Sequence, residues 1–120
     1  MKEIKLPDSE LKVMDIIWEK GEVSAKETAQ RMGERYGWKK NTTYTVLKNL
    51  HEKGILERIE PGFLCRPLVG REQVGRTEVK HLLNRFYQGS PAALFASFLE
   101  QKTISRKELD EIKDMIDRFE

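Results

Sequence analysis

The fold of this chain is decided by residues 38–56, which read WKKNTTYTVLKNLHEKGIL. Residues 42–53 contain no glycine or proline, and Val46, Leu47 and Leu50 recur at the spacing of one helical face. Gly54 follows, and glycine most readily adopts the left-handed conformation that closes a helix. The segment therefore predicts a short helix with one buried face.

The opposite face of this helix is predicted to be polar and cationic. It carries Lys39, Lys40, Asn41, Thr43, Tyr44 and Lys48. Between residues 36 and 53 four lysines stand against one glutamate, in a chain whose net charge is only +2. A helix with a buried back and a cationic front is typical of a reader of the DNA major groove. The alternative is an ordinary solvated face, because lysine is common on any protein surface.

Composition bounds the class of protein. The chain has 120 residues, of which 38% are hydrophobic and 35% charged, as expected for a soluble, helical, globular protein of one or two small units. No apolar run approaches the ~20 residues that span a bilayer. Residues 1–10, MKEIKLPDSE, lack an apolar signal region, which predicts a cytoplasmic protein. Because the net charge is small, any contact with nucleic acid must come from a local patch.

The residues that usually carry catalysis are sparse and isolated. Cys65 is the only cysteine, so neither an intramolecular disulfide nor a cysteine metal cluster is possible, and we expect it to act as a small hydrophobic residue. His51 and His81 have no Cys, Ser or Asp at motif spacing, and the chain has no phosphate-binding loop. The sequence therefore predicts no enzyme, no metal, no cofactor and no small-molecule ligand.

Two helices are predicted to precede residues 38–56. Ser9 is expected to cap the first, whose apolar stripe reaches Trp18, a core anchor rather than a stacking platform for bases. Gly21 is expected to close it. Residues 24–27, SAKE, form a capping box for the second, which Gly37 closes. The buried face of this second helix is predicted to consist of Ala25, Ala29 and Met32.

The pattern changes to short strands after Gly54. Residues 55–59 and 63–66 read as two strands, and residues 60–62, EPG, are a turn signal between them. Three helices followed by a hairpin define a winged helix, a variant of the helix-turn-helix. Arg58 and Arg66 are predicted to reach DNA phosphates from this wing.

The last fifty residues predict further helices with broad apolar faces. The first carries its apolar stripe over residues 79–87, the next is capped by Ser90, and residues 105–108 form a capping box for the last. Burial of each large apolar side chain stabilises a fold by roughly 1.5–3 kcal/mol, and three short helices leave many of these side chains exposed to solvent. A second copy would cover them, so we expect a homodimer; the alternative is that they fold back onto the winged helix. The predicted dimerisation residues are Leu82, Leu83, Phe86, Tyr87, Leu94, Phe95, Phe98, Leu99, Leu109, Ile112, Met115 and Ile116.

The predicted fold class is therefore mainly α with a small β-hairpin. We place an N-terminal winged helix-turn-helix DNA-binding domain in residues 1–70 and a three-helix C-terminal dimerisation domain in residues 71–120.

Several motifs resemble those of the penicillinase-repressor family of bacterial winged-helix repressors. They are VMDIIW at 13–18, W-x₃-T-x₂-T-x-L-x₂-L-x₂-KG at 38–54, a hairpin closing on Pro67, LLNRFYQGS at 82–90 and ALFASFLE at 93–100. The resemblance covers nearly the whole chain. It implies a homodimeric transcriptional repressor on dyad operators upstream of resistance or cell-envelope genes, released when a membrane sensor metalloprotease cuts the dimerisation half.

The resemblance also implies roles for residues of the 38–56 segment. Asn41, Tyr44 and Thr45 stand where the family's helix contacts bases, and Lys48 stands near its phosphate contacts. Thr42 matches a threonine common in the family. Lys39 and Lys40 replace the family's usual Ser-Pro helix start.

The cleavage site and a copper-sensing branch can also be compared. The family is cut between an Asn and a Phe, and the matching bond in this chain is Ser97–Phe98. A copper-responsive branch carries paired cysteines near the C-terminus, and their absence here argues against a copper sensor.

The predicted function is thus a sequence-specific dimeric repressor that binds a dyad operator in double-stranded DNA and is relieved by proteolysis in its dimerisation half. The alternative is a winged-helix protein-interaction module that does not bind DNA and whose 38–56 face meets an acidic partner.

Overall fold

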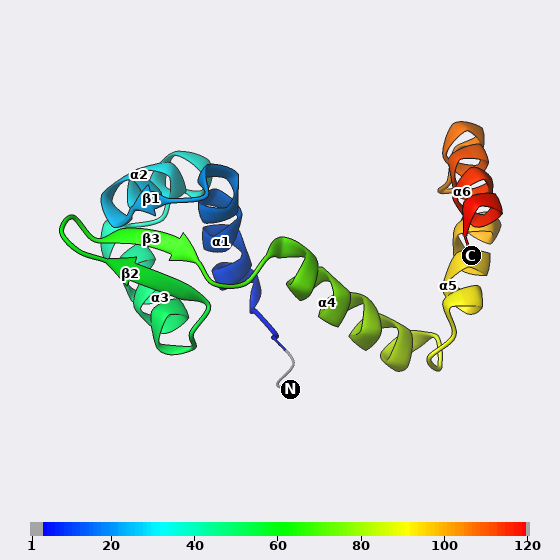
Figure 1. Ribbon diagram of the computed structural model, residues 1–120, viewed down its shortest axis with the longest axis horizontal. Coiled ribbons are helices and arrows are strands. Elements are labelled where there is room, and N and C mark those ends of the chain that lie inside the picture. Colours follow the sequence, from blue (N-terminus) through cyan, green and yellow to red (C-terminus); the bar gives the residue numbers. More distant parts are fainter. Residues whose placement is uncertain (1–3, 120) are drawn as a thin grey trace. The chain divides into compact units, whose positions relative to one another are not determined.

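The computed structural model describes residues 4–119 and divides into two compact units, one ending at Glu78 and the other beginning at Val79 (Figure 1). The elements of the first unit are α1 (Asp8–Lys20), β1 (Val23–Ser24), α2 (Ala25–Tyr36), α3 (Lys40–Glu52), β2 (Leu56–Ile59), β3 (Leu64–Pro67) and the start of α4 (Arg71–Phe86). The mainly helical fold with a hairpin confirms the predicted fold class.

A small antiparallel sheet follows the helices of the first unit, as predicted, and gains a strand that the sequence did not indicate. Its strand order is β1-β3-β2 over the described residues, with Val23 opposite Cys65 and Arg58 opposite Cys65 on the other side. Strand β1 is only two residues long, too short to show a period of two in sequence. The amide of Ala25 donates to the carbonyl of Phe63 at 2.9 Å, which ties the wing to the start of α2.

The hydrophobic core lies where α1, α2, α3 and the sheet meet. Its largest fully buried side chains include Met14, Ile16, Ile17, Met32, Leu47, Leu50 and Leu56. Trp18 packs against this core and donates its indole N–H to the carbonyl of Val69 at 2.9 Å, which confirms its anchoring role. Val74, in the first turn of α4, is also buried here, so the first unit continues past the boundary at residue 70 that the sequence placed.

The helix caps agree with the sequence in part. Helix α1 begins two residues earlier than predicted: Pro7 is the cap residue, and its carbonyl accepts from Leu11 N at 3.0 Å, so the prediction of Ser9 as cap is wrong. No side-chain cap forms at this end, and Asp8 and Glu10 instead place acidic side chains in the first turn, at the positive end of the helix dipole. Gly21 and Gly37 close α1 and α2 at positive φ, as predicted.

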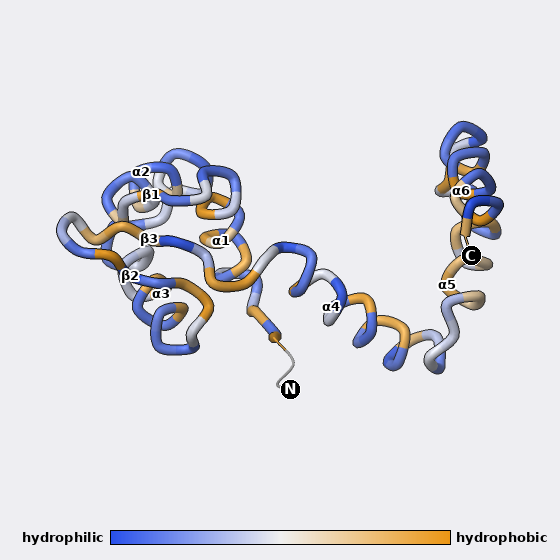
Figure 2. The backbone as a smooth tube through the Cα atoms, viewed as in Figure 1, coloured by the Kyte–Doolittle hydropathy of each residue, from blue (hydrophilic) through white to orange (hydrophobic). Residues whose placement is uncertain are grey.

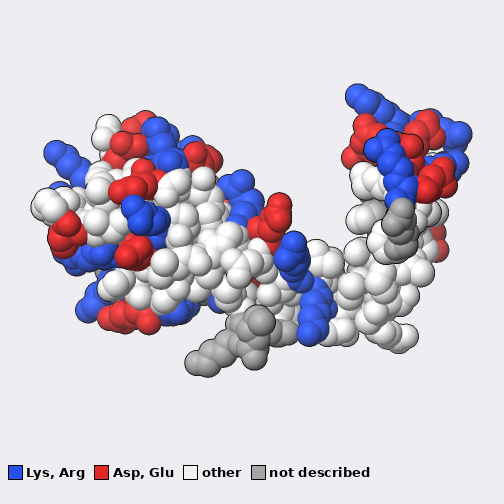
Figure 3. All heavy atoms as spheres, viewed as in Figure 1, with Lys and Arg blue, Asp and Glu red and all other residues white. Residues whose placement is uncertain are grey.

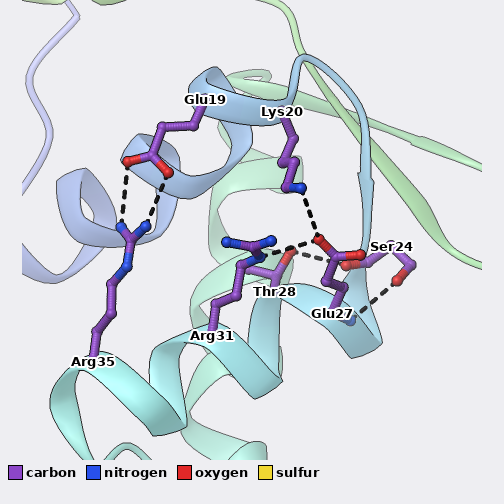
Figure 4. A network of polar contacts seen from close by, with 7 residues as sticks. All are labelled: Glu19, Lys20, Ser24, Glu27, Thr28, Arg31 and Arg35. Carbon is purple, nitrogen blue, oxygen red and sulfur yellow. Dashed lines mark hydrogen bonds and ion pairs between the residues drawn. The ribbon is translucent and has the colours of Figure 1, made fainter.

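Polar contacts at the surface join α1 and α2 (Figure 4). The Ser24 hydroxyl accepts from Glu27 N at 3.0 Å, whereas the Glu27 carboxylate turns to Arg31 at 3.1 Å and Lys20 at 3.7 Å. Only half of the predicted capping box therefore forms. Arg35 donates twice to Glu19, at 2.9 and 3.3 Å, and this hydrogen bonding lowers the pKa of the Glu19 carboxyl.

The second unit comprises the rest of α4, then α5 (Pro91–Gln101) and α6 (Arg106–Arg118). Ser90 caps α5 by accepting from Ala93 N at 3.1 Å, and the Ser105–Glu108 capping box of α6 is complete, as predicted. Throughout α5 and α6, every residue of which is described, no side chain is buried. Apolar residues recur along the second half of α4 and along α5 (Figure 2). Within residues 4–119 no helix combines the length and the hydropathy needed to cross a membrane.

Candidate nucleic-acid interface

Helix α3 presents one polar face to solvent and one apolar face to the core. Val46, Leu47 and Leu50 are buried, as the spacing predicted. The exposed residues predicted to contact DNA are Lys39, Lys40, Asn41, Thr45 and Lys48. Thr42, the threonine common in the family, is exposed as well. The helix is therefore amphipathic in the sense that a groove reader requires.

Thr43 does not belong to the exposed face, so its prediction as a front-face contact is wrong. Its side chain is fully buried. Positions three, four and seven residues ahead of a given residue share its helical face, so Thr43 lies with Val46, Leu47 and Leu50. Its hydroxyl has no hydrogen-bond partner among the described residues.

The first turn of α3 lacks a side-chain cap. Lys39 is the cap residue, and its carbonyl accepts from the amides of Thr42 and Thr43 at 3.0 and 3.3 Å. Asn41 lies inside the helix rather than at its cap position. The first turn contains no acidic residue, so Lys40 adds charge to the positive end of the helix dipole. A phosphate placed at this end would be attracted by both.

Tyr44 is half-buried and packs against the core cluster, which the sequence did not indicate. Its ring meets the ring of Phe63, in the wing, edge to face with centroids 6.1 Å apart. The ammonium of Lys40 lies 5.7 Å from the centre of the Tyr44 ring. The ring of Tyr44 is thus engaged in packing between α3 and the wing.

The two wing arginines lie in different surroundings. Arg58 Nε donates to Glu60 Oε2 at 2.5 Å, and this contact, followed by the hydrogen bond from Phe63 N, holds the pKa of Glu60 below its ordinary value. Arg66 lies between two carboxylates, with Nη2 at 3.3 Å from Glu22 and Nη1 at 3.9 Å from Glu57. Among the residues that the structure describes, Arg58 therefore has one carboxylate partner and Arg66 has two.

A shallow pocket beside the start of α3 adds surface that sequence reasoning missed. It has a volume of about 390 Å³ and is lined by Lys26, Ala29, Gln30, Gly33, Trp38 and Lys40. Lys26 stands in the first turn of α2 and brings a second cation to this side of the domain. The sequence alone does not place Lys26 beside Lys40, because fourteen positions separate the two lysines. The packing of α2 against α3 brings them to the same pocket. On the face shown in Figure 3, basic and acidic side chains are otherwise intermixed over the first unit.

Cys65, which we expected to act as a small hydrophobic residue, lies in an environment that suppresses its reactivity. Cys65 is buried in β3, where burial raises the pKa of its thiol to about 11. It is therefore neutral at ordinary pH, and a neutral thiol is a poor nucleophile. Within the described residues, no group of three or more His, Cys, Asp or Glu side chains could hold a metal ion.

The bond matched to the family's cleavage site lies inside α5. Ser97 is half-buried, and its hydroxyl oxygen lies 3.4 Å from the Tyr87 hydroxyl and 3.0 Å from Gln101 Nε2. Phe98 is exposed. Because the bond is helical, a protease could take it into an extended conformation only after α5 opens locally.

A winged helix-turn-helix domain is defined by three helices, the third of which is the exposed cationic helix α3, and by a hairpin wing. The model of the family described as "Penicillinase repressor" matches residues 6–118, and this chain belongs to that family.

Relatives of known name support the assignment over almost the full length. The chain is 28% identical over 120 residues to the penicillinase repressor of Bacillus licheniformis, covering 98% of this chain and 94% of that protein. It is 25% identical over 119 residues to the methicillin resistance regulatory protein MecI of Staphylococcus aureus (strain N315), covering 98% and 97%. These relatives are repressors and regulatory proteins rather than enzymes, in agreement with the sequence.

A solved structure supports the fold of the first unit. The solution structure of the DNA binding domain of the repressor BlaI superimposes with a TM-score of 0.55 and 27% identity, covering 60% of this chain and 90% of that domain.

Proposed function

We propose that this protein is a transcriptional repressor that binds a dyad DNA operator as a homodimer and is released by proteolysis in its second unit. The observation that carries the proposal is the exposed, cationic and uncapped start of α3, on a winged helix of the penicillinase repressor family.

The proposed DNA contacts divide by chemistry. Lys39, Lys40, Lys48 and Arg58 supply cations for phosphates, which position the domain on the duplex. Asn41 and Thr45 are exposed on α3 and supply side-chain hydrogen bonds for base edges. Tyr44 offers bases its hydroxyl, since its ring packs against Phe63. We place Arg66 among the weaker contacts, because DNA would have to compete with Glu22 and Glu57.

Exposed apolar side chains of the second unit support the homodimer. Six of the predicted dimerisation residues are exposed: Leu82, Phe86, Phe98, Leu99, Met115 and Ile116. The others are half-buried: Leu83, Tyr87, Leu94, Phe95, Leu109 and Ile112. A soluble monomer rarely exposes so many large apolar residues together, and a second copy offers the same faces for pairing.

Dimerisation would give the operator complex much of its strength. Linking two readers makes the second contact intramolecular, which can add ~10²–10⁴ in avidity. A cut at Ser97–Phe98 would split α5 and remove that gain. The proposed agent is a membrane sensor metalloprotease, as the family resemblance implies.

Footprinting on genomic fragments tests the proposal. We expect a protected palindrome with half-sites about one helical turn or a multiple apart, and a log–log salt slope of about −0.9 for each phosphate contacted. A flat slope and no protected site would leave the alternative of a protein-interaction module. For the release step, the wild type and Phe98→Pro should each be co-expressed with a candidate sensor protease. We expect the wild type to be cut and Phe98→Pro to stay intact. An uncut wild-type protein would contradict cleavage at Ser97–Phe98.

A further inference from the structure

A row of interacting cationic and aromatic side chains joins α3 to the wing within the first unit. Lys40 Nζ lies 5.7 Å from the centre of the Tyr44 ring, and the rings of Tyr44 and Phe63 are 6.1 Å apart at an angle of 63°. Arg58 Cζ then lies 3.8 Å from the centre of the Phe63 ring. We call these four residues the cation–aromatic ladder. One cation comes from α3 and the other from β2, so the ladder connects the two elements that a winged helix presents to DNA.

Phe63 occupies a backbone conformation that favours glycine, not phenylalanine. Its φ is +49°, in the left-handed region, where a side chain is disfavoured. The backbone is held there from both sides, because its carbonyl accepts from Ala25 N at 2.9 Å and its amide donates to Glu60 Oε1 at 3.1 Å. Glycine would satisfy the same bonds without that cost. What phenylalanine adds at this position is its ring, which is seated between Tyr44 and Arg58.

The ring of Phe63 and the carboxylate of Glu60 together fix the guanidinium of Arg58. Its Nε donates to Glu60, and its Cζ lies over the ring of Phe63. Neither terminal nitrogen of Arg58 has a hydrogen-bond partner in the part of the chain that the structure describes. Arg58 therefore presents two free donor nitrogens from a held side chain. An arginine fixed before binding loses less rotamer entropy when it meets a phosphate.

We propose that Phe63 is a positioning residue for DNA binding, whose ring holds Arg58 at a fixed offset from Lys40 so that the wing and α3 contact the DNA backbone as one unit. The inference rests on the proposed function, since it names how two cations of that interface are set. It also gives Tyr44 a second role, as the ring that carries this spacing from α3 to the wing.

The test is a double-mutant cycle on the full-length protein. The probe is a duplex that the wild type selects from a pool of random 30-base-pair duplexes, and affinity is measured over a range of salt. We expect Phe63→Leu, which keeps apolar bulk but has no ring face, to bind about three- to tenfold more weakly. Phe63→Tyr keeps the ring and should bind within roughly twofold of the wild type. Arg58→Ala should flatten the salt slope by up to ~0.9, and by less in the Phe63→Leu background.

Arg66 provides the matched control, because it is a wing arginine that lies between carboxylates and makes no contact with an aromatic ring among those found in the described residues. The effects of Arg66→Ala and Phe63→Leu should simply multiply, whereas those of Arg58→Ala and Phe63→Leu should not. If the effects of the Arg58 and Phe63 substitutions on DNA affinity are independent, or if Phe63→Leu and Phe63→Tyr lose equal affinity, this inference is overturned and the proposed function is not. A wild type that selects no duplex overturns the inference and the proposed function together.

Discussion

At the scale of single residues, Thr43 shows what burial of an unpaired polar group costs. Its hydroxyl is buried on the core side of α3 with no acceptor among the described residues. Such a group typically costs about 1–3 kcal/mol. We expect Thr43→Val, which keeps the shape, to raise the free energy of unfolding in urea by about 1 kcal/mol. Thr43→Ser, which keeps the hydroxyl and removes a methyl group, should lower it. A destabilised Thr43→Val would show that the hydroxyl has a partner.

The thiol of Cys65 predicts a dependence of stability on high pH. Burial raises its pKa from 9.0 to about 11. In an unfolded chain the thiol ionises first, so its contribution to stability is complete below pH 9.0 and is lost as the pH rises through about 11. The free energy of unfolding, measured in urea, should therefore fall more steeply with pH over this range for the wild type than for Cys65→Ala. Parallel curves for the two proteins would contradict a buried, neutral thiol.

The Tyr44 hydroxyl and ring can be separated by substitution. If the hydroxyl reads a base, Tyr44→Phe should lose about 1–3 kcal/mol on the selected operator and much less on random DNA. Tyr44→Ala should lose more on both, because it also removes the ring that packs against Phe63. The measurement is competition binding against both DNAs. Equal affinities of Tyr44→Phe and the wild type would assign Tyr44 to packing alone.

At the scale of elements, an ion pair fastens the start of α1 to the end of α3. The carboxylate of Glu10 is nearly fully buried and accepts from Lys53 Nζ at 2.7 and 2.9 Å. Lys53 is partly exposed, so solvent can replace some of what it supplies. We expect Lys53→Met to cost about 1–3 kcal/mol of unfolding free energy, because the Glu10 carboxylate is left buried and unpaired. Adding Glu10→Gln should recover part of that loss.

A more exposed lysine–carboxylate ion pair serves as the control for this element. Lys12 pairs with Asp8 at 3.1 Å on the surface of α1. Lys12→Met removes this pair and the contact of the ammonium with the Tyr36 ring at 4.9 Å, and should change stability by less than about 1 kcal/mol. If the Lys12 and Lys53 variants were equally affected, burial of Glu10 would not be the cause.

Elements with a strong local signal could be predicted from the sequence, and those that depend on tertiary contact could not. The helix at 40–52 follows from its apolar spacing, and Gly21 and Gly37 mark real helix ends. Strand β1 depends on pairing with β3, in which Val23 lies opposite Cys65 and Ser24 opposite Leu64. Tyr44 and Lys26 acquire their neighbours from the wing and from α3, so their sequence context gave no sign of it. Thr43 was misassigned although its helical spacing from Leu47 and Leu50 already placed it inside.

At the scale of the whole molecule, the chain is divided between a unit with a closed core and a unit without one. The first unit buries residues from α1 through the start of α4. No residue of α5 or α6 is buried, although both helices are described in full. A sequence records that the later helices are apolar on one side, but it does not record what covers them. For this reason the dimer remains a prediction, whereas the winged helix is confirmed.

The last prediction concerns that uncovered surface. Ile116 on α6 is 64% exposed in the single chain, so replacing it should leave the chain folded. If a second copy covers it, Ile116→Glu places an unpaired charge in the interface, which is strongly unfavourable. We expect sedimentation equilibrium to shift from dimer to monomer, and operator affinity to fall by about 10²–10⁴ as avidity is lost. Lys113→Glu, a larger charge change on a polar position of the same helix, should remain dimeric. A dimeric Ile116→Glu protein with wild-type affinity would exclude this face of α6 from the interface.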